Sequence, residues 1–510
     1  MANRIGFEFQ VGARAVDAPR RVDPDDPLRI LILGDFSGRA NRAVEQASNL
    51  ASRRLPRVDV DNFDQVLAAC APSLRLVPGA DSAGDIEVVF RELDDFHPDR
   101  LYGNVDMFCA LREARTGLQD PATFARTADG LRQSIAHQAV GAGAAPAAPA
   151  ENDATTFARL LGSAGAAPAT SLAPQPQGVQ ALIRSIVAPH IVPDAPPQQA
   201  QYLATVDGLI RAQMQFVLHD PAFQALEAAW RSVRWLLAET EAGETLHVHL
   251  LDVSLAELRA DMRACDNDHR RSGLYRRLVE HETRAADDLP WSLLAGAFTL
   301  GKNVEDIELM AFLGAVAAHA GGPLIAGADA SFAGCVSLVA TPDPRDWQAG
   351  GSEAEARWLA LRKSPVAAWL GLALPQVLMR LPYGRKTDAV AAFPFEELDP
   401  DAAHGEFLWG SAAVACALLT SRAFATAGWS MQPGDERDLG DLPAYIRERD
   451  GEKLLMPAAE AYLGERAVDV LLGAGLMPLA SMKNRNAILV PRMQSIAAPA
   501  RPLAGPWDAV

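Results

Sequence analysis

The sequence predicts an α/β protein with two α/β domains, an Ala/Pro-rich linker between them and an N-terminal extended strand arm. Three observations support this class. Short apolar runs alternate with amphipathic helical patterns along most of the chain, as in βαβ units. The composition shifts towards Ala, Pro and Gly over residues 133–200. A length of 510 residues also favours more than one domain.

Composition excludes several classes of function. The formal net charge is −17, whereas binding to nucleic-acid phosphates needs clustered Lys and Arg, so we expect no nucleic-acid partner. Five scattered cysteines favour reduced cytosolic thiols over disulfides or a metal site. Residues 1–11 lack the apolar core of a signal peptide, and Gly321-Gly322-Pro323 interrupts the uncharged run 310–328. We therefore expect no membrane insertion.

Residues 1–28 are predicted to form a strand followed by an extended arm. Ile5, Phe7, Phe9 and Val11 alternate with polar or glycine residues, which is the period of a half-buried strand. A lone strand cannot satisfy its own backbone hydrogen bonds. We therefore expect this strand to pair with a sheet, either its own or a neighbour's.

The first domain is predicted over residues 29–132. It begins with a buried strand that runs into the turn Gly34-Asp-Phe-Ser-Gly-Arg39. This turn is neither a Walker A motif, because no GK[ST] follows, nor GxGxxG. We interpret it as a plain turn, with Asp35 bonding the loop backbone and Arg39 as a surface or interface charge. A later helix is expected to start with Asp61 as its N-cap.

Residues 133–200 are predicted to be a flexible linker with one short helix, because Ala/Pro/Gly-rich stretches cannot bury a core. The second domain is predicted over residues 201–496, with a tail at 497–510. Its helices begin at recognisable caps: Asp220 before a proline, and Ser254 in a capping box with Glu257. The segment 292–328 is patterned as strand, helix and strand.

No set of residues in the sequence assembles a catalytic, cofactor-binding or metal site. His247 and His249 share one face of a strand but lack a third ligand nearby. Ser411 lies in a motif that lacks the last glycine of GxSxG. The helix that begins after Asp220 carries Glu227, Trp230 and Arg231. We expect these three side chains to lie at the helix surface and to serve packing and ion pairing. We therefore expect no enzyme, no metal and no cofactor.

Two sets of motifs resemble the subunits of one machine. RILILGDFSGR, VDVDNFDQVLAACAPSL and FRELDDFHPDRLY resemble the small subunit of the type VI secretion contractile sheath. LHDPAFQALEAAWRSVRWLL, LHVHLLDVSLAEL, LGLALPQVLMRLPYG, FPFEEL, FLWGSAAVACALL and GLMPLA, within residues 153–496, resemble the large subunit. The residues that carry the motifs are Gly34, Asp35, Ser37, Gly38, Asp61, Asn62, Phe63, Trp230, Leu381, Pro382, Tyr383, Gly384, Phe395, Glu396, Glu397, Leu408, Trp409 and Gly410.

The resemblance implies a cytoplasmic fusion of the two sheath subunits. Such a protein would assemble with itself or other sheath subunits around an inner-tube protein, rest on a baseplate and drive the tube outward by lattice rearrangement. A AAA+ unfoldase would recycle it. In the family the N-terminal strand joins a neighbour's sheet, which places the inter-subunit arm at residues 5–11. The unfoldase grips a helix at the start of the large subunit, which corresponds to Phe157, Leu160 and Leu161.

Two departures from the family pattern keep alternatives open. Large subunits continue past the GLMPLA region, whereas this sequence ends at Val510, so we expect a C-terminally truncated large-subunit part. The glycine-rich stretch expected after Gly428-Trp429 is replaced by residues 431–438. One alternative is a non-contracting, sheath-derived accessory protein that binds full-length sheath subunits or the baseplate. A second is a nucleotide-binding α/β enzyme that uses residues 34–39.

Overall fold

The computed structural model describes residues 23–42, 47–77, 86–141, 199–240, 243–266, 268–280, 289–348, 350–399, 402, 404–449, 452–483 and 485–509. We call residues 23–141 the N-terminal part and residues 199–509 the C-terminal part. The predicted arm strand (Ile5, Phe7, Phe9 and Val11) and the predicted unfoldase-binding residues (Phe157, Leu160 and Leu161) lie outside the described residues.

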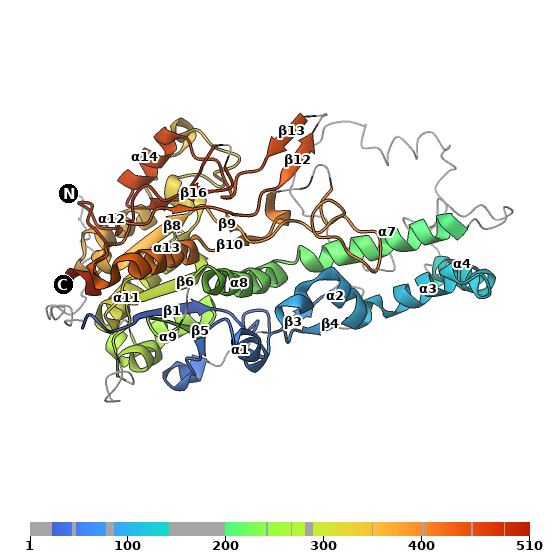
Figure 1. Cartoon of the computed structure of the whole chain (residues 1–510), viewed down its shortest axis with the longest axis horizontal. Helices are drawn as coiled ribbons and strands as arrows, with labels where there is room; N and C mark the ends of the chain where they lie inside the picture. Colours follow the sequence, from blue (N-terminus) through green and yellow to red (C-terminus); the bar gives the residue numbers. More distant parts are fainter. Residues whose placement is uncertain are drawn as a thin grey trace, which may run out of the picture.

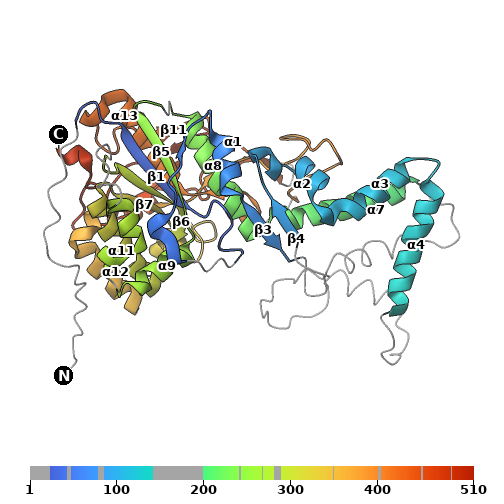
Figure 2. The same cartoon turned by 90° about the horizontal axis from the view of Figure 1, so that it is seen from below.

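A seven-stranded sheet lies at the centre of the broad end of the molecule (Figures 1 and 2). Its order is β14-β8-β7-β6-β1-β5-β2, and all neighbours are parallel except β2, which is antiparallel to β5. The strands are β1 (Leu28–Gly34), β2 (Arg57–Val58), β5 (Leu246–Asp252), β6 (Leu293–Leu300), β7 (Leu324–Ala328), β8 (Leu370–Leu374) and β14 (Met477–Pro478). The α/β class predicted from the sequence is thus confirmed.

Strand β1 joins the two parts of the chain in this one sheet. It comes from the N-terminal part, yet it lies between β5 and β6 of the C-terminal part. All seven residues of β1 are paired with β5, and residues 30–33 are also paired with β6. The two predicted α/β domains therefore share their central sheet, and the boundaries drawn for them from the sequence remain predictions.

Helices cover both faces of the sheet, and the alternation of β1 shows which helix covers which face. Ile30 and Ile32 belong to the core formed with α8 and α13, whereas Leu31 and Leu33 belong to the core formed with α9, α11 and α12. The helices are α8 (Pro221–Ala238), α9 (Leu255–Ala264), α11 (Val304–Ala320), α12 (Glu353–Lys363) and α13 (Ala412–Ala427). Burial on both faces explains why the strands are almost continuously apolar.

A limb of helices extends away from the sheet (Figures 1 and 2). In it α3 packs against both α4 and α7. The limb helices are α3 (Cys109–Gln119), α4 (Phe124–Gly141) and α7 (Gln199–Leu218), with α2 (Pro98–Asn104) at the base. The helix α4 ends at Gly141, so residues 133–141 of the predicted linker are helical.

Small elements complete the structure. Four sheets of two or three strands pair as β3–β4, β9–β10, β11–β16–β15 and β12–β13. Their strands are β3 (Ser73–Leu76), β4 (Ile86–Val89), β9 (Val377–Leu378), β10 (Trp409–Gly410), β11 (Asp438–Leu439), β12 (Ile446–Arg449), β13 (Glu452–Leu455), β15 (Ala480–Ser481) and β16 (Ile488–Leu489). The remaining α-helices in the part of the chain that the structure describes are α1 (Phe63–Cys70), α10 (Gly273–Tyr275) and α14 (Glu465–Gly473).

Capping chemistry explains where several helices begin. The Asp220 carboxylate accepts hydrogen bonds from the backbone N–H of Ala222 and Phe223, and Ser254 forms a complete capping box with Glu257, as predicted. The prediction for Asp61 is wrong, because α1 begins at Phe63 and Asn62 holds the N-cap position. The backbone N–H groups of Asp61 and Asn62 instead donate to Asp59 Oδ1.

One helix among the described residues is long and apolar enough to span a membrane by length and composition. It covers Ala412–Ser430, which includes α13. Of the apolar stretch in this helix, 72% is buried inside the protein, as is typical of a core helix. The uncharged run 310–328 covers α11 from Met310 to its end and all of β7, and is almost entirely buried.

Candidate functional site: the joint between the two parts

The turn after β1 is fastened to the end of β5. Asp252, the last residue of β5, accepts hydrogen bonds from the N–H groups of Phe36 (2.9 Å) and Ser37 (3.1 Å) and from Ser37 Oγ (2.8 Å). Within the turn, Asp35 accepts from the N–H of Arg39 (2.7 Å) and of Ala40 (2.8 Å), as the sequence predicted. Two carboxylates thus fix the turn, one from each part of the chain.

Gly38 is required at this turn for two physical reasons. Its φ is +75°, in the left-handed region that side chains rarely adopt. A Cβ at this position would also lie 2.3 Å from the carbonyl oxygen of Ser73, the first residue of β3. The glycine therefore lets the turn pack directly on the β3–β4 hairpin, and no phosphate needs to be invoked to explain it.

Glu257 holds two arginines of the N-terminal part. Its carboxylate accepts from Arg39 Nε (2.8 Å) and Nη2 (2.7 Å), and from Arg53 Nη2 (2.9 Å) and Nη1 (3.2 Å). Burial alone would raise the pKa of the Glu257 carboxyl, but the hydrogen bonds from Arg39 and Arg53 outweigh it and lower the pKa to about 2. Arg39, predicted to be a surface or interface charge, lies at the contact between the two parts of the chain, where its side chain is 16% exposed.

Trp230 connects α8 to the N-terminal part. Its indole Nε1 donates to the carbonyl oxygen of Phe36 at 2.9 Å, and the ring is fully buried. The ring centroid lies 5.2 Å from that of Phe36 and 5.7 Å from that of Phe63 in an edge-on arrangement. Trp230 therefore brings the turn motif and the Asn62-Phe63 motif together on one side chain.

A buried ion network lies next to Trp230 on the same helix. Arg380 donates to Glu227 (2.8 Å) and to Glu397 (2.7 and 3.0 Å), and Arg231 donates to Glu227 (2.7 Å) and to the hydroxyl of Tyr383 (3.0 Å). Burial raises the pKa of Tyr383 strongly. The predicted ion pairing of Glu227 and Arg231 is confirmed. The predicted place at a helix surface is wrong, because Glu227 and Trp230 are fully buried.

The segment 391–397, which ends at Glu397 of this network, also contacts helices α2 and α3 of the N-terminal part. Asp99 of α2 accepts from the N–H of Ala391 (3.0 Å) and of Ala392 (2.8 Å), and Arg115 donates to the carbonyl oxygen of Ala392 (3.0 Å). The ring of Phe393 lies 4.9 Å from that of Tyr102. The loop that presents Glu397 is therefore fixed by the N-terminal part.

The other motif residues take structural places around this joint. Trp409 and Gly410 form β10 and pair with β9, and the carbonyl of Leu408 accepts from the N–H of Met379 at 3.0 Å. Pro382, Gly384 and Phe395 are buried, Leu381 is half-buried, and Glu396 is exposed beside Gly384. Ser411 caps α13 and donates to the carbonyl of Gly296 at 3.0 Å, which uses its hydroxyl structurally.

The two histidines of β5 do not converge with a third ligand. Their ring centroids lie 6.5 Å apart, and burial lowers the pKa of both, that of His249 to about 4. Within the described residues, no group of three or more His, Cys, Asp or Glu side chains is arranged to hold a metal ion.

Sequence reasoning missed several residues of the joint. Asp252 and Arg380 lie within motifs that resemble the large subunit but received no role of their own, Arg53 lies in none of these motifs, and the local sequence identifies Glu257 only as a capping-box residue. One signal could have been used: charged residues within otherwise apolar stretches, such as Arg380 in VLMRLPYG, require a partner when they are buried.

Comparison with known proteins identifies the families that the two parts of the chain match. The family described as "EvpB/VC_A0108, tail sheath N-terminal domain" matches residues 200–497, and "Type VI secretion system, VipA, VC_A0107 or Hcp2" matches residues 3–140. The chain is 30% identical over 305 residues to the type VI secretion system sheath protein TssC1 of Pseudomonas aeruginosa, covering 58% of this chain and 61% of that protein.

The N-terminal part has a separate relative. It is 30% identical over 108 residues to the sheath protein TssB1 of Pseudomonas aeruginosa, covering 20% of this chain and 63% of that protein. The chain thus spans about three fifths of the length of each curated relative it matches. Because the tail sheath family matches more than half of the chain, the chain belongs to the type VI secretion sheath family, and it is a fusion of a small-subunit part with a large-subunit part.

Proposed function

We propose that this protein is a structural component of the contractile sheath of a type VI secretion system, which assembles around the inner tube and drives its ejection by lattice rearrangement. Its partners would be further sheath subunits, the inner-tube protein, the baseplate and a AAA+ recycling unfoldase, in the cytoplasm. The observation that carries this proposal is the place of β1 in the central sheet, because it makes both sheath-type parts a single building block.

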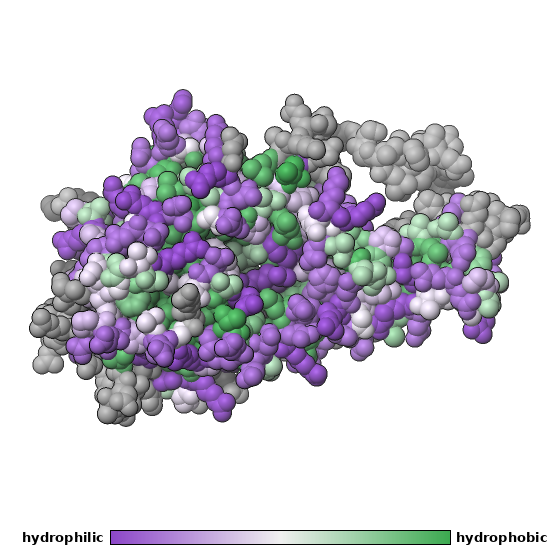
Figure 3. Space-filling model, in the orientation of Figure 1, coloured by the Kyte–Doolittle hydropathy of each residue, from purple (hydrophilic) through white to green (hydrophobic). Residues whose placement is uncertain are grey.

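Exposed apolar side chains on two small sheets support a role in assembly. Ile446 and Leu455 lie opposite each other on the β12–β13 hairpin and are 59% and 46% exposed, and hydrophobic residues are visible in that region in Figure 3. Val89 of β4 is 53% exposed. Two-stranded sheets with exposed apolar faces are marginal in water and typical of docking surfaces.

The β3–β4 hairpin also offers an edge to which a strand can be added. The side chain of Asn41 occupies the outer edge of β3, since it accepts from the N–H of Arg75 (2.6 Å) and donates to its carbonyl (3.0 Å). Among the described residues, β4 pairs with β3 alone. An inter-subunit link by the predicted strand at residues 5–11 requires an open edge of this kind.

Electron microscopy tests the proposal. Purified protein, alone and mixed with the inner-tube protein, is expected to form tubules or rings in negative stain. Monomers under both conditions would contradict it. Substoichiometric binding to full-length sheath without polymerisation would instead favour the accessory role.

A double substitution tests whether the predicted arm strand links subunits. Phe7→Asp combined with Phe9→Asp is expected to abolish higher assembly and leave the thermal unfolding midpoint unchanged, because charges on the apolar face prevent strand pairing. Gln10→Asp, on the opposite face of the predicted strand, serves as the matched control and should assemble normally. Equal assembly of all variants would show that the arm does not link subunits.

A further inference from the structure

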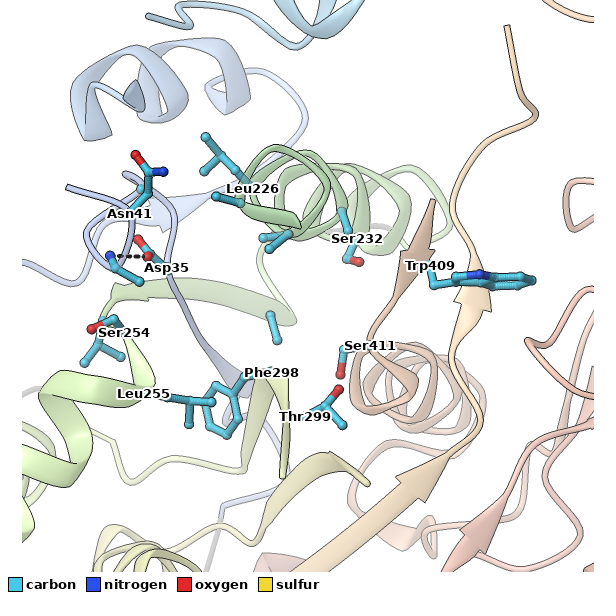
Figure 4. Close-up of a pocket in the computed structure, with 18 of the residues that line it drawn as sticks. Asp35, Asn41, Leu226, Ser232, Ser254, Leu255, Phe298, Thr299, Trp409 and Ser411 are labelled. Atoms are coloured by element: carbon cyan, nitrogen blue, oxygen red, sulfur yellow. Dashed lines mark hydrogen bonds between the residues drawn. The ribbon is translucent and has the colours of Figure 1, made fainter. Parts of the chain in front are cut away.

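A cavity of about 340 Å³ lies beside the joint (Figure 4). It is lined by the turn after β1, by residues that follow β5, and by residues 297–299 near the end of β6. The strands that follow β1 in the chain, β2 and β5, lie on one side of it, whereas β6 and the strands that follow it, β7 and β8, lie on the other side. Such a switch at the carboxyl ends of parallel strands is where open α/β sheets bind ligands. The volume is at the lower end of the ~300–1,000 Å³ typical of small-molecule sites.

The wall of this cavity is mainly apolar. In Figure 4, Leu226 of α8, Leu255 of α9 and Phe298 of β6 lie on the left of the space, with the hydroxyl residues Ser232, Thr299 and Ser411 on the right. The other apolar side chains that line it are Ala40, Leu74, Ala222, Ala225, Ala228, Ala229, Val253, Ala297 and Trp409. Of the described residues that line it, Asp35 alone carries a charge. Both Asp35 carboxylate oxygens already accept backbone N–H groups, so the cavity presents neither a cation for an anionic ligand nor a free carboxylate for a cation.

The polar groups at the rim are largely used by the protein itself. The Asn41 amide bonds to the backbone of Arg75, as described above. The hydroxyl of Ser411 donates to Gly296 and accepts from Ala413. The hydroxyl of Thr299 accepts from Gln376 at 3.2 Å. A ligand gains little hydrogen bonding here, whereas it can bury apolar surface against the wall.

We propose that this cavity binds a small, uncharged apolar molecule the size of one or two aromatic rings. A dry apolar cavity of ~150 Å³ suffices for benzene in another protein, so the available space fits a bicyclic ring. Because residues of both parts line the cavity, such a ligand stabilises the joint between them. The proposal goes beyond the sheath function and does not depend on it.

Indole is a suitable probe for the full-length protein. We expect saturable binding in isothermal titration calorimetry and a thermal unfolding midpoint that rises with indole concentration. Indole-2-carboxylate, which has the same ring system and a negative charge, is expected to bind at least tenfold more weakly. The cavity wall offers its carboxylate no cation in return for the lost hydration.

Two lining variants and one control locate the binding. Ala229→Leu fills part of the cavity, and Leu255→Asp places a charge on its wall at the first residue of α9, where an acidic side chain suits the helix dipole. Both should lose at least tenfold in indole affinity. Ala238→Leu makes the same change as the first variant at an exposed position of α8 and should bind normally.

Two results would overturn the proposal. The first is no saturable binding of indole up to its solubility limit. If Leu255→Asp then also changes the sedimentation coefficient, the cavity receives a side chain from a second copy instead. The second is equal binding by all variants. If Ala229→Leu does not fold, Leu255→Asp decides the question.

Discussion

Single carboxylates in the joint serve two elements at once. Glu257 completes the capping box of α9 and also forms hydrogen-bonded ion pairs with Arg39 and Arg53 of the N-terminal part. Its side chain is 4% exposed, whereas those of Arg39 and Arg53 are 16% and 13% exposed. Removing its charge would leave two partly buried arginines without their shared partner, which is a more costly change than loss of a surface ion pair.

The variant Glu257→Gln tests this clamp. It keeps a capping-box side chain, so α9 should form, but we expect a loss of about 2–4 kcal/mol in the free energy of unfolding at pH 7. Urea denaturation measures the change. The control Glu353→Gln removes an ion pair whose carboxylate is 59% exposed and should cost less than about 1 kcal/mol. Equal losses in the two variants would show that the clamp contributes no more than a surface pair.

The same variant has a defined dependence on pH. The pKa of Glu257 falls from its usual 4.5 to about 2 on folding, so the folded carboxyl binds its proton less readily than the unfolded one. The stability from this group is therefore fully present above pH 4.5 and is lost as the pH falls towards 2. Glu257→Gln should show a shallower loss of stability over that interval. An unchanged slope would mean that the clamp is absent.

At the scale of elements, the sequence predicted strands and helix starts well, because both depend on local pattern. The run RILIL and the caps at Asp220 and Ser254 are examples. The place of β1 between β5 and β6 could not be predicted, since an apolar run does not specify its neighbours in a parallel sheet. These neighbours depend on contacts more than 200 residues away in the chain, such as Leu28 with Leu246.

For the candidate site, too, the sequence predicted the local features but not how they come together in the fold. The motif residues were recognised one by one, but their meeting around Trp230 and Arg380 depends on tertiary packing. The sequence left open whether Arg39 is a surface or an interface charge, because nothing in the local sequence indicates that Glu257 lies beside it. Asp61 was assigned as a cap because Asp and Asn are both favoured at that position and are adjacent here.

The central place of β1 predicts its behaviour in hydrogen exchange. All its residues are buried and both of its edges are paired, so its amides should exchange only when the whole sheet unfolds. We expect their protection to be within about tenfold of that of the β7 amides, measured by hydrogen–deuterium exchange with mass spectrometry. Protection of β1 that is hundreds of times weaker would show that the N-terminal part detaches from the sheet.

At the scale of the whole molecule, the N-terminal part supplies β1 and β2 of the central sheet and the limb helices α3 and α4, while the C-terminal part supplies the rest of the sheet and α7 (Figures 1 and 2). Each part is thus incomplete without the other. In this chain the small-subunit and large-subunit parts of a sheath form one folded unit with a fixed one-to-one ratio.

Cleavage between the two parts tests this unity most directly. A site-specific protease sequence inserted after residue 165 allows the purified protein to be cut without denaturant, and size-exclusion chromatography with light scattering then gives the mass. We predict that the two fragments remain together, with the mass of the uncut protein and a single cooperative thermal transition. Separation of the fragments under native conditions would contradict the shared sheet.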